Sequence, residues 1–235
     1  MQEETSDNVS VELLSFNNLS LEGYPLVLDN YQRAYVWGVD KVIQLLNDLL
    51  SFIQESEDED AYYMGTLLLH KKIGEKQKVL CVIDGQQRLT SLAVLYWLLN
   101  KQLPTHIQFS FRSSRSMVNV QQAKQTIQHW LAENNLEIDK LVGVFDRLRF
   151  TVIIVTREDL AFTFFDTQNN RGVPLGSTDL LKSFHLRAIH SDDAQIDELL
   201  QSHCASRWEK VQVQGELGKL SSEPYRVYRR LFYLS

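Results

Sequence analysis

The chain has 235 residues, of which 44% are hydrophobic and 23% charged, and its formal net charge is −6. This composition is typical of a folded, soluble protein with ample material for a core. The negative charge argues against a surface that coats DNA generally, although it is compatible with a local basic groove. No apolar run reaches the roughly 18 residues of a membrane span, and residues 1–8 lack a secretory pattern. The two cysteines suggest neither a disulfide framework nor a metal site, so we expect a cytoplasmic protein.

The pattern of apolar residues predicts strands and helices in mixed order. In chain order we expect weak alternation from residue 9, a strand at 25–28, an amphipathic helix at 42–53, strands at 62–70 and 79–83, a helix at 89–99, a strand at 107–111, helices at 117–133 and 138–145, a strand at 149–155, and helices at 158–165, 193–211 and 225–235. The strands 62–70 and 79–83 should pair as a hairpin. Strands and helices do not alternate regularly, and this order predicts an α+β fold with a mixed sheet. The last helical pattern ends without a cap, so we expect either a longer protein or a partner for this helix.

The most informative stretch is DGQQR at 84–88, which joins the apolar strand 79–83 to the next helix. Both flanks are too apolar to lie outside the core, so these polar residues should be held at the edge of a rigid scaffold, where sites are built. The first turn of a helix also leaves backbone N–H groups without intrahelical partners. Together with the helix dipole, these groups favour an anion.

A purely structural interpretation of the same residues is also open. Asp84 could be the N-cap of the helix, with Gln87 closing a capping box three residues later. A cap does not require Gln86, Arg88 or Gly85, however. A fixed guanidinium beside free amides suits a phosphate.

Two further polar breaks follow core elements. The segment 31–37, YQRAYVW, mixes aromatic residues with an arginine at the exit of a strand, although tyrosine and tryptophan there could serve packing alone. The segment 166–175 lies between the predicted helix 158–165 and a further helix that Ser177 can cap. It contains Asn169, Arg171 and Gly172, which could also belong to an ordinary helix-ending loop.

Several familiar chemistries have no motif in this chain. It contains no GxxxxGK[ST] phosphate loop, no GxGxxG fingerprint, no HExxH zinc helix and no nucleophile elbow, and its six histidines are scattered. Amide, guanidinium and carboxylate groups on loops remain, and they suit phosphate and Mg²⁺ better than covalent catalysis.

Three segments in order, YQRAYVW at 31–37, IDGQQRLTSL at 83–92 and FDTQNNRGVPLGSTDLLKS at 165–183, resemble the GmrSD-type restriction endonuclease N-terminal domain family. The resemblance covers about 9–190. It implies a nucleotide-binding domain with a ParB/sulfiredoxin-like mixed sheet and flanking helices. Residues 191–235 would then be a helical segment that begins a longer C-terminal region.

The resemblance also implies a function. Family members look like sensors of modified phage DNA that hydrolyse a nucleoside triphosphate with Mg²⁺ and act with a C-terminal HNH-type nuclease domain or subunit. No segment of this chain resembles that nuclease, so we expect no DNA cleavage by this chain alone. The alternatives are a non-catalytic module that reads DNA and a regulatory module that docks the nuclease.

The match can be carried over residue by residue. The implied catalytic residues are Asp84, Gln86, Gln87 and Arg88, with Asp84 also the expected Mg²⁺ ligand. The implied nucleotide-binding residues are Tyr31, Gln32, Arg33, Trp37, Gly85, Asn169, Arg171, Gly172 and Lys182. One departure is Ser91, where relatives commonly have threonine. We expect the three segments to converge on one pocket.

Overall fold

The structure is a computed structural model of the whole chain. It describes residues 8–20, 22–28, 32, 34–73, 78–111, 113–134, 138–157, 159–161, 186, 199–201 and 203–208. Within these ranges, no helix has the length and apolar character needed to cross a membrane.

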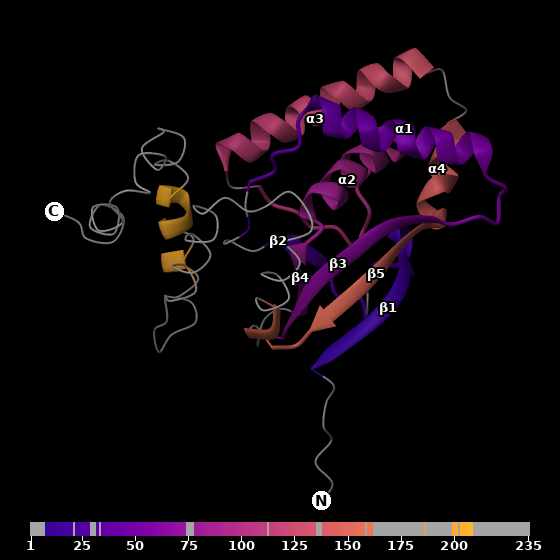
Figure 1. Cartoon of the computed structure of the whole chain (residues 1–235). Helices are drawn as coiled ribbons and strands as arrows, with labels where there is room; N and C mark the ends of the chain where they lie inside the picture. Colours follow the sequence, from indigo (N-terminus) through magenta and orange to yellow (C-terminus); the bar gives the residue numbers. More distant parts are fainter. Residues whose placement is uncertain are drawn as a thin grey trace, which may run out of the picture.

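In the described residues, five strands form one mixed sheet in the order β1-β5-β3-β4-β2 (Figure 1). The strands are β1 (Val9–Ser15), β2 (Leu26–Leu28), β3 (Tyr62–Ile73), β4 (Lys78–Asp84) and β5 (Leu148–Val155). β3 and β4 are antiparallel, which confirms the predicted hairpin. β2 pairs with β4, and β5 with β3, in parallel, whereas β1 and β5 are antiparallel. The predicted α+β class with a mixed sheet is confirmed.

Four helices accompany this sheet within the described ranges: α1 (Val39–Glu55), α2 (Gln86–Asn100), α3 (Ser114–Asn134) and α4 (Ile138–Arg147). Figure 1 shows α2 beneath α1 and α3, on the side of the sheet. Buried residues occur on every side of α2, from its first turn to Leu98. A helix that is buried on every side lies inside a core, so α2 is the central element of the fold.

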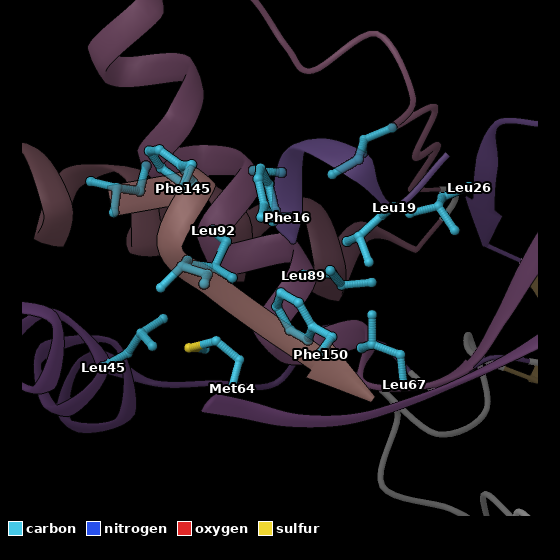
Figure 2. Packing of buried hydrophobic residues seen from close by; sticks show 14 of the residues in the cluster. Phe16, Leu19, Leu26, Leu45, Met64, Leu67, Leu89, Leu92, Phe145 and Phe150 are labelled. Atoms are coloured by element: carbon cyan, nitrogen blue, oxygen red, sulfur yellow. The ribbon is translucent and has the colours of Figure 1, made fainter. Parts of the chain in front are cut away.

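The main core lies between the sheet and these helices. Leu67 of β3 and Phe150 of β5 are fully buried with Leu89 and Leu92 of α2 (Figure 2). In the same cluster, the rings of Phe16 and Phe145 pack with their centroids 5.1 Å apart, a distance typical of favourable aromatic contacts. This packing fixes α2, and with it the turn that precedes α2, against the sheet.

Two strand predictions differ from the structure. The predicted strand at 107–111 is wrong: Ile107 forms an isolated parallel bridge with Leu26, and no ladder follows. The partner strand β2 has three residues, which leaves the rest of the segment without a strand beside it. β3 continues to Ile73, three residues past its expected end, because these residues still pair with the start of β4.

The C-terminal part of the chain is described only in pieces. Residues 159–161 and most of 199–208 are helical, as predicted. Ala161, Leu186 and Ala205 are buried in a second apolar cluster with Leu68 and Cys81 of the sheet. The predicted loop at 166–175 and the helix at 225–235 lie outside the described residues, and the division of the chain at residue 190 stays a prediction.

We predict a pH-dependent stability that originates at His106. Its ring is 7% exposed and packs edge-on against Phe16, and burial lowers the pKa of His106 from 6.5 to about 4. Between these pH values the unfolded chain takes up a proton that the folded chain does not, so stability should fall as the pH is lowered from 6.5 towards 4. The slope should approach roughly 1.4 kcal/mol per pH unit.

Urea unfolding of the parent and of His106→Asn at several pH values measures this effect. Other groups titrate equally in both proteins, so the difference between the two free energies of unfolding isolates the histidine. A difference that stays constant from pH 7 to pH 4 would contradict the assignment.

Candidate functional site

Two parallel strands end side by side at the candidate site. β2 and β4 are parallel neighbours, with Leu28 opposite Val82, so their carboxyl ends lie at the same edge of the sheet. The segment 29–38 follows β2, and the turn Asp84–Arg88 follows β4. The carboxyl ends of parallel strands are where ligands bind in many α/β sheets.

Gly85 makes the strand-to-helix turn possible. Its φ of +94° lies in the left-handed region, which residues with a side chain rarely adopt. A Cβ at this position would also run into the Cδ2 atom of Leu67. The N-cap of α2 is Gly85 itself, with no side-chain capping bond, and Asp84 is the last residue of β4. The capping-box interpretation of Asp84 and Gln87 is therefore wrong.

The uncapped helix end leaves donors open. The first hydrogen bond of α2 runs from the N–H of Leu89 to the carbonyl of Gly85, at 3.0 Å. Within the described part of the chain, the N–H groups of Gln86, Gln87 and Arg88 have no acceptor. Three such groups at the positive end of a helix dipole form a favourable place for an anion.

The side chain of Gln87 holds residues 34–37, which belong to the first of the three family segments, 31–37 (the first motif). Its Oε1 accepts hydrogen bonds from the backbone N–H groups of Val36, at 2.8 Å, and Trp37, at 3.2 Å. Its Nε2 donates to the carbonyl of Ala34, at 3.2 Å. The residue is 5% exposed, so these bonds form in a region shielded from water. The amide of Gln87 therefore fixes the backbone of residues 34–37 against α2.

Gln32 makes the corresponding link to β4. Its Nε2 donates to the carbonyls of Val82, at 2.7 Å, and Ile83, at 3.1 Å. The first motif and the second family segment, 83–92 (the second motif), are thus in direct contact, as the sequence predicts. Trp37 is half-buried against the main core, while Tyr31 and Arg33 lie outside the described residues.

Tyr35 anchors the same loop and was not identified from the sequence. Its side chain is fully buried, and its hydroxyl pairs with the Ser91 hydroxyl at 2.8 Å. Its N–H donates to Oγ of Ser116 at 3.0 Å, and its carbonyl accepts from Nδ2 of Asn119 at 2.7 Å. Burial raises the pKa of Tyr35. These partners lie on α2 and α3, far along the chain, so no local pattern indicates them.

Arg88 contacts β3 just beyond the point where the pairing between β3 and β4 ends. β4 ends at Asp84, opposite Leu68. Beyond this pair, the Arg88 guanidinium donates from Nη2 to the carbonyl of Thr66, at 2.7 Å, and from Nη1 to the carbonyl of Met64. Arg88 thus gives β3 the donors that a continuing strand would have supplied.

Gly65 leaves the space that this contact needs. It lies at a register shift in β3 with φ of +97°, and a Cβ there would meet Nη1 of Arg88. Burial lowers the pKa of Arg88, and the nearby charge of Asp84 opposes this shift. Within the described residues, no ion pair involves Arg88.

Asp84 and Gln86 carry the polar groups that remain unused. The half-buried carboxylate of Asp84 accepts no hydrogen bond from a described residue. Gln86 is 5% exposed, and its Oε1 has no described partner. No group of three His, Cys, Asp or Glu residues in the described ranges could hold a metal ion. A Mg²⁺ ion on Asp84 would therefore take other ligands from phosphates and water, as this ion commonly does.

The third predicted segment cannot be placed. Asn169, Arg171, Gly172 and Lys182 lie outside the described residues, so their convergence on the site stays a prediction.

Comparison with known proteins gives one family. The family model described as GmrSD restriction endonuclease, N-terminal domain, matches residues 12–186 of the chain. No curated protein sequence matches the chain significantly.

We predict that the same substitution has opposite effects at two glycines. Gly85→Ala should lower the free energy of unfolding by about 2 kcal/mol or more, because alanine is strained at positive φ and its Cβ meets Leu67. Gly143→Ala in the middle of α4 has open space around it, and it should stabilise the protein by about 0.5–1 kcal/mol. Chemical denaturation measures both. Equal effects at the two positions would contradict the assigned turn.

We also predict that Gln87 controls the order of the first motif. In Gln87→Ala, the amides of Val36 and Trp37 lose their acceptor and should exchange with deuterium about tenfold faster or more. Amide exchange followed by NMR measures this directly. Gln122→Ala, an exposed change on α3, is the control and should leave both amides unchanged. Unaltered protection in Gln87→Ala would show that the loop is held by other contacts.

Proposed function

We propose that this chain, which belongs to the GmrSD restriction endonuclease N-terminal domain family, binds a nucleoside triphosphate with Mg²⁺ at Asp84–Arg88 and hydrolyses it. The observation that carries the proposal is the uncapped start of α2, where three N–H groups without a described acceptor lie next to the Asp84 carboxylate, which has no described hydrogen bond. The proposal includes a fold similar to ParB and sulfiredoxin, whose nucleotide phosphates occupy the place of this turn.

The charges of the turn fit a metal–phosphate group. The Arg88 side chain is half-buried, and no described carboxylate forms an ion pair with it. A phosphate nearby would offset its charge. Asp84 alone would repel a phosphate, whereas a hard divalent cation between them would reverse the interaction. The turn, with its N–H donors, guanidinium and carboxylate, thus suits a phosphate together with Mg²⁺ better than it suits a phosphate or Mg²⁺ alone.

Each residue then has a distinct role. A nucleotide-bound Mg²⁺ held by Asp84 would supply positive charge beside the phosphoryl group that is transferred to water. Asp84 holds the metal ion, and the N–H groups of α2 hold the phosphates. Gln86 Oε1 has no described donor and is buried, so it would orient the attacking water only if its side chain turns towards the site. Gln87 is a positioning residue, because its amide is used to hold residues 34–37.

The hydrolysis would serve a restriction system. We place the chain as the sensor domain of a modification-dependent phage-defence system, with modified DNA as its trigger and an HNH-type nuclease domain or subunit as its partner. The family description names the N-terminal domain of a restriction endonuclease and so supports this context. The first motif is linked to β4 by Gln32 and to α2 by Gln87. It is the part of the chain that would transmit recognition of DNA to the turn.

A second function, a non-catalytic DNA-reading or nuclease-docking module, has one observation in its favour. The side chains of Gln87 and Arg88 already bond to backbone groups of the scaffold. A turn with a purely structural role would show the same contacts. The two functions differ in what they require of Asp84.

We predict that Asp84→Asn abolishes turnover and leaves the fold intact. The change removes the negative charge that a hard cation needs, so the rate should fall on the order of a hundredfold or more. The melting temperature should barely move, because the carboxylate has no described hydrogen bond. Phosphate release from ATP, GTP, CTP and UTP, with and without DNA, is the measurement.

Asp58→Asn is the matched control, because Asp58 is exposed in the loop after α1, and it should keep the parent rate. Parent-level hydrolysis by a folded Asp84→Asn protein would refute the catalytic role of Asp84. Absence of turnover in the parent with every nucleotide, with and without DNA, would favour the non-catalytic module.

A further inference from the structure

The two edges of the described sheet differ in how they are protected. β2, at one edge, has three residues and is covered by the segment 106–108: the N–H of Leu26 donates to the carbonyl of His106 at 2.7 Å, and its carbonyl accepts from the N–H of Gln108 at 2.9 Å. β1, at the other edge, has seven residues that pair with β5 without a register shift (Figure 1). One edge is thus short and covered, and the other is long and regular.

The middle of β1 is exposed on both of its faces. Residues 10–13 are all exposed, and among them Val11 is 62% and Leu13 65% exposed. β1 also lacks the features that usually keep an edge strand from pairing, because it contains no lysine, no proline and no bulge. Its one charged residue is Glu12. A regular, largely apolar edge strand of this kind is suited to pair with a further strand.

The register of β1 on β5 shows which backbone groups of β1 are open. Just beyond the two strands, the N–H of Thr156 donates to the carbonyl of Asn8 at 3.1 Å. Asn8 and every second residue after it therefore direct their N–H and C=O groups towards β5, because the direction alternates along a strand. Val9, Val11 and Leu13 direct theirs away from β5, and no described residue bonds to them.

We propose that this open edge of β1 pairs with the same edge of a second copy of the chain. A twofold axis through Val11 places Val11 opposite itself and Val9 opposite Leu13 of the other copy. In this antiparallel register each pair exchanges both of its N–H···O bonds. The open groups of both copies are then satisfied, and the two five-stranded sheets become one continuous sheet.

The side chains of β1 also suit their own copy. Val9, Val11 and Leu13 share one face of the strand, so apolar side chains meet apolar side chains across the axis. On the other face, Glu12 lies opposite Ser10, whose hydroxyl can donate to the carboxylate. An axis through Glu12 would keep the backbone bonds but would place two carboxylates opposite each other, which is unfavourable. The charge of Glu12 therefore selects the axis at Val11.

The size of the contact sets its strength. Stable complexes bury at least about 1,000 Å², and a strand of seven residues offers less than this on its own. We expect a reversible dimer with a dissociation constant on the order of 10–100 μM. The proposal concerns association alone, so it does not depend on nucleotide binding or hydrolysis at the turn before α2.

The first test compares two exposed valines. Sedimentation velocity of the full chain, from about 1 to 500 μM, measures the dissociation constant. Val11→Lys places two like charges at the axis and should weaken the dimer about tenfold or more. Val118→Lys makes the same change at a position of α3 that is 66% exposed, and it should keep the parent value. Thermal melting shows that both variants are folded.

The second test locates the axis by disulfide formation. In a background of Cys81→Ala and Cys204→Ala, Val11→Cys should form an intermolecular disulfide with oxidised glutathione, because hydrogen-bonded partners have Cα atoms about 5.5 Å apart. Leu13→Cys should not, since the two copies of this residue are about 14 Å apart along the strands in the proposed register. Non-reducing electrophoresis measures both.

A parent chain that stays monomeric up to about 500 μM would overturn the proposal and leave the edge to an extended segment of another protein. A dimer that a folded Val11→Lys protein keeps at the parent strength would overturn it as well. Cross-linking of Leu13→Cys without cross-linking of Val11→Cys would refute the axis. Because none of these measurements uses a nucleotide, their failure would leave the proposed function of the turn untouched.

Discussion

The left-handed turn at Gly85 is the constraint on which the rest of the structure depends. It lets β4 pass directly into α2 beneath Leu67, with no room for a side chain. α2 then enters the core one residue after the sheet ends. Because the turn is so short, Arg88 arrives at the carbonyls that β4 leaves open on β3. The backbone of the turn and the Arg88 guanidinium thus connect the sheet to the central helix, in addition to the core packing between them.

The polar residues of this turn fall into two groups according to their partners. Gln87 and Arg88 are used by the scaffold, which follows the rule that buried polar groups are hydrogen-bonded. Asp84 and Gln86 have no described partner, although Gln86 is as buried as Gln87. Gln86 is thus a buried exception to this rule, whereas Asp84 is half-buried and its carboxylate can be solvated by water or, under the proposed function, bind Mg²⁺.

Elements with a clear periodicity of apolar residues were predicted correctly from the sequence. Features that depend on contacts between residues far apart in the chain were not. The hairpin of β3 and β4 and the helices α1 and α3 follow from apolar spacing alone. The segment 107–111 is apolar in the same way, but its residues face a pocket and the core, and periodicity does not distinguish these surroundings from a ladder.

The site shows the same limit. The contact between the first two motifs was predicted, because both follow core strands. The roles of their side chains were not. Arg88 bonds to carbonyls 22 and 24 residues earlier in the chain, and Tyr35 bonds to residues 81 and 84 positions away. The capping box failed because Gly85 takes the cap position, which the pattern of Asp84 and Gln87 does not reveal.

The position of β1 has a consequence for how the chain folds during its synthesis. β1 forms one edge of the sheet, and its partner is β5, so that Val9 pairs with Val155. Of the five described strands, β1 is made first and is among the last to find its place, since β5 is made only after the other four. Until then the backbone of β1 has no partner strand, and an unpaired strand is open to association with other chains. Pairings of such long range also slow folding. The nascent domain therefore has an interval in which protection of its N-terminal strand by a chaperone would be of most use.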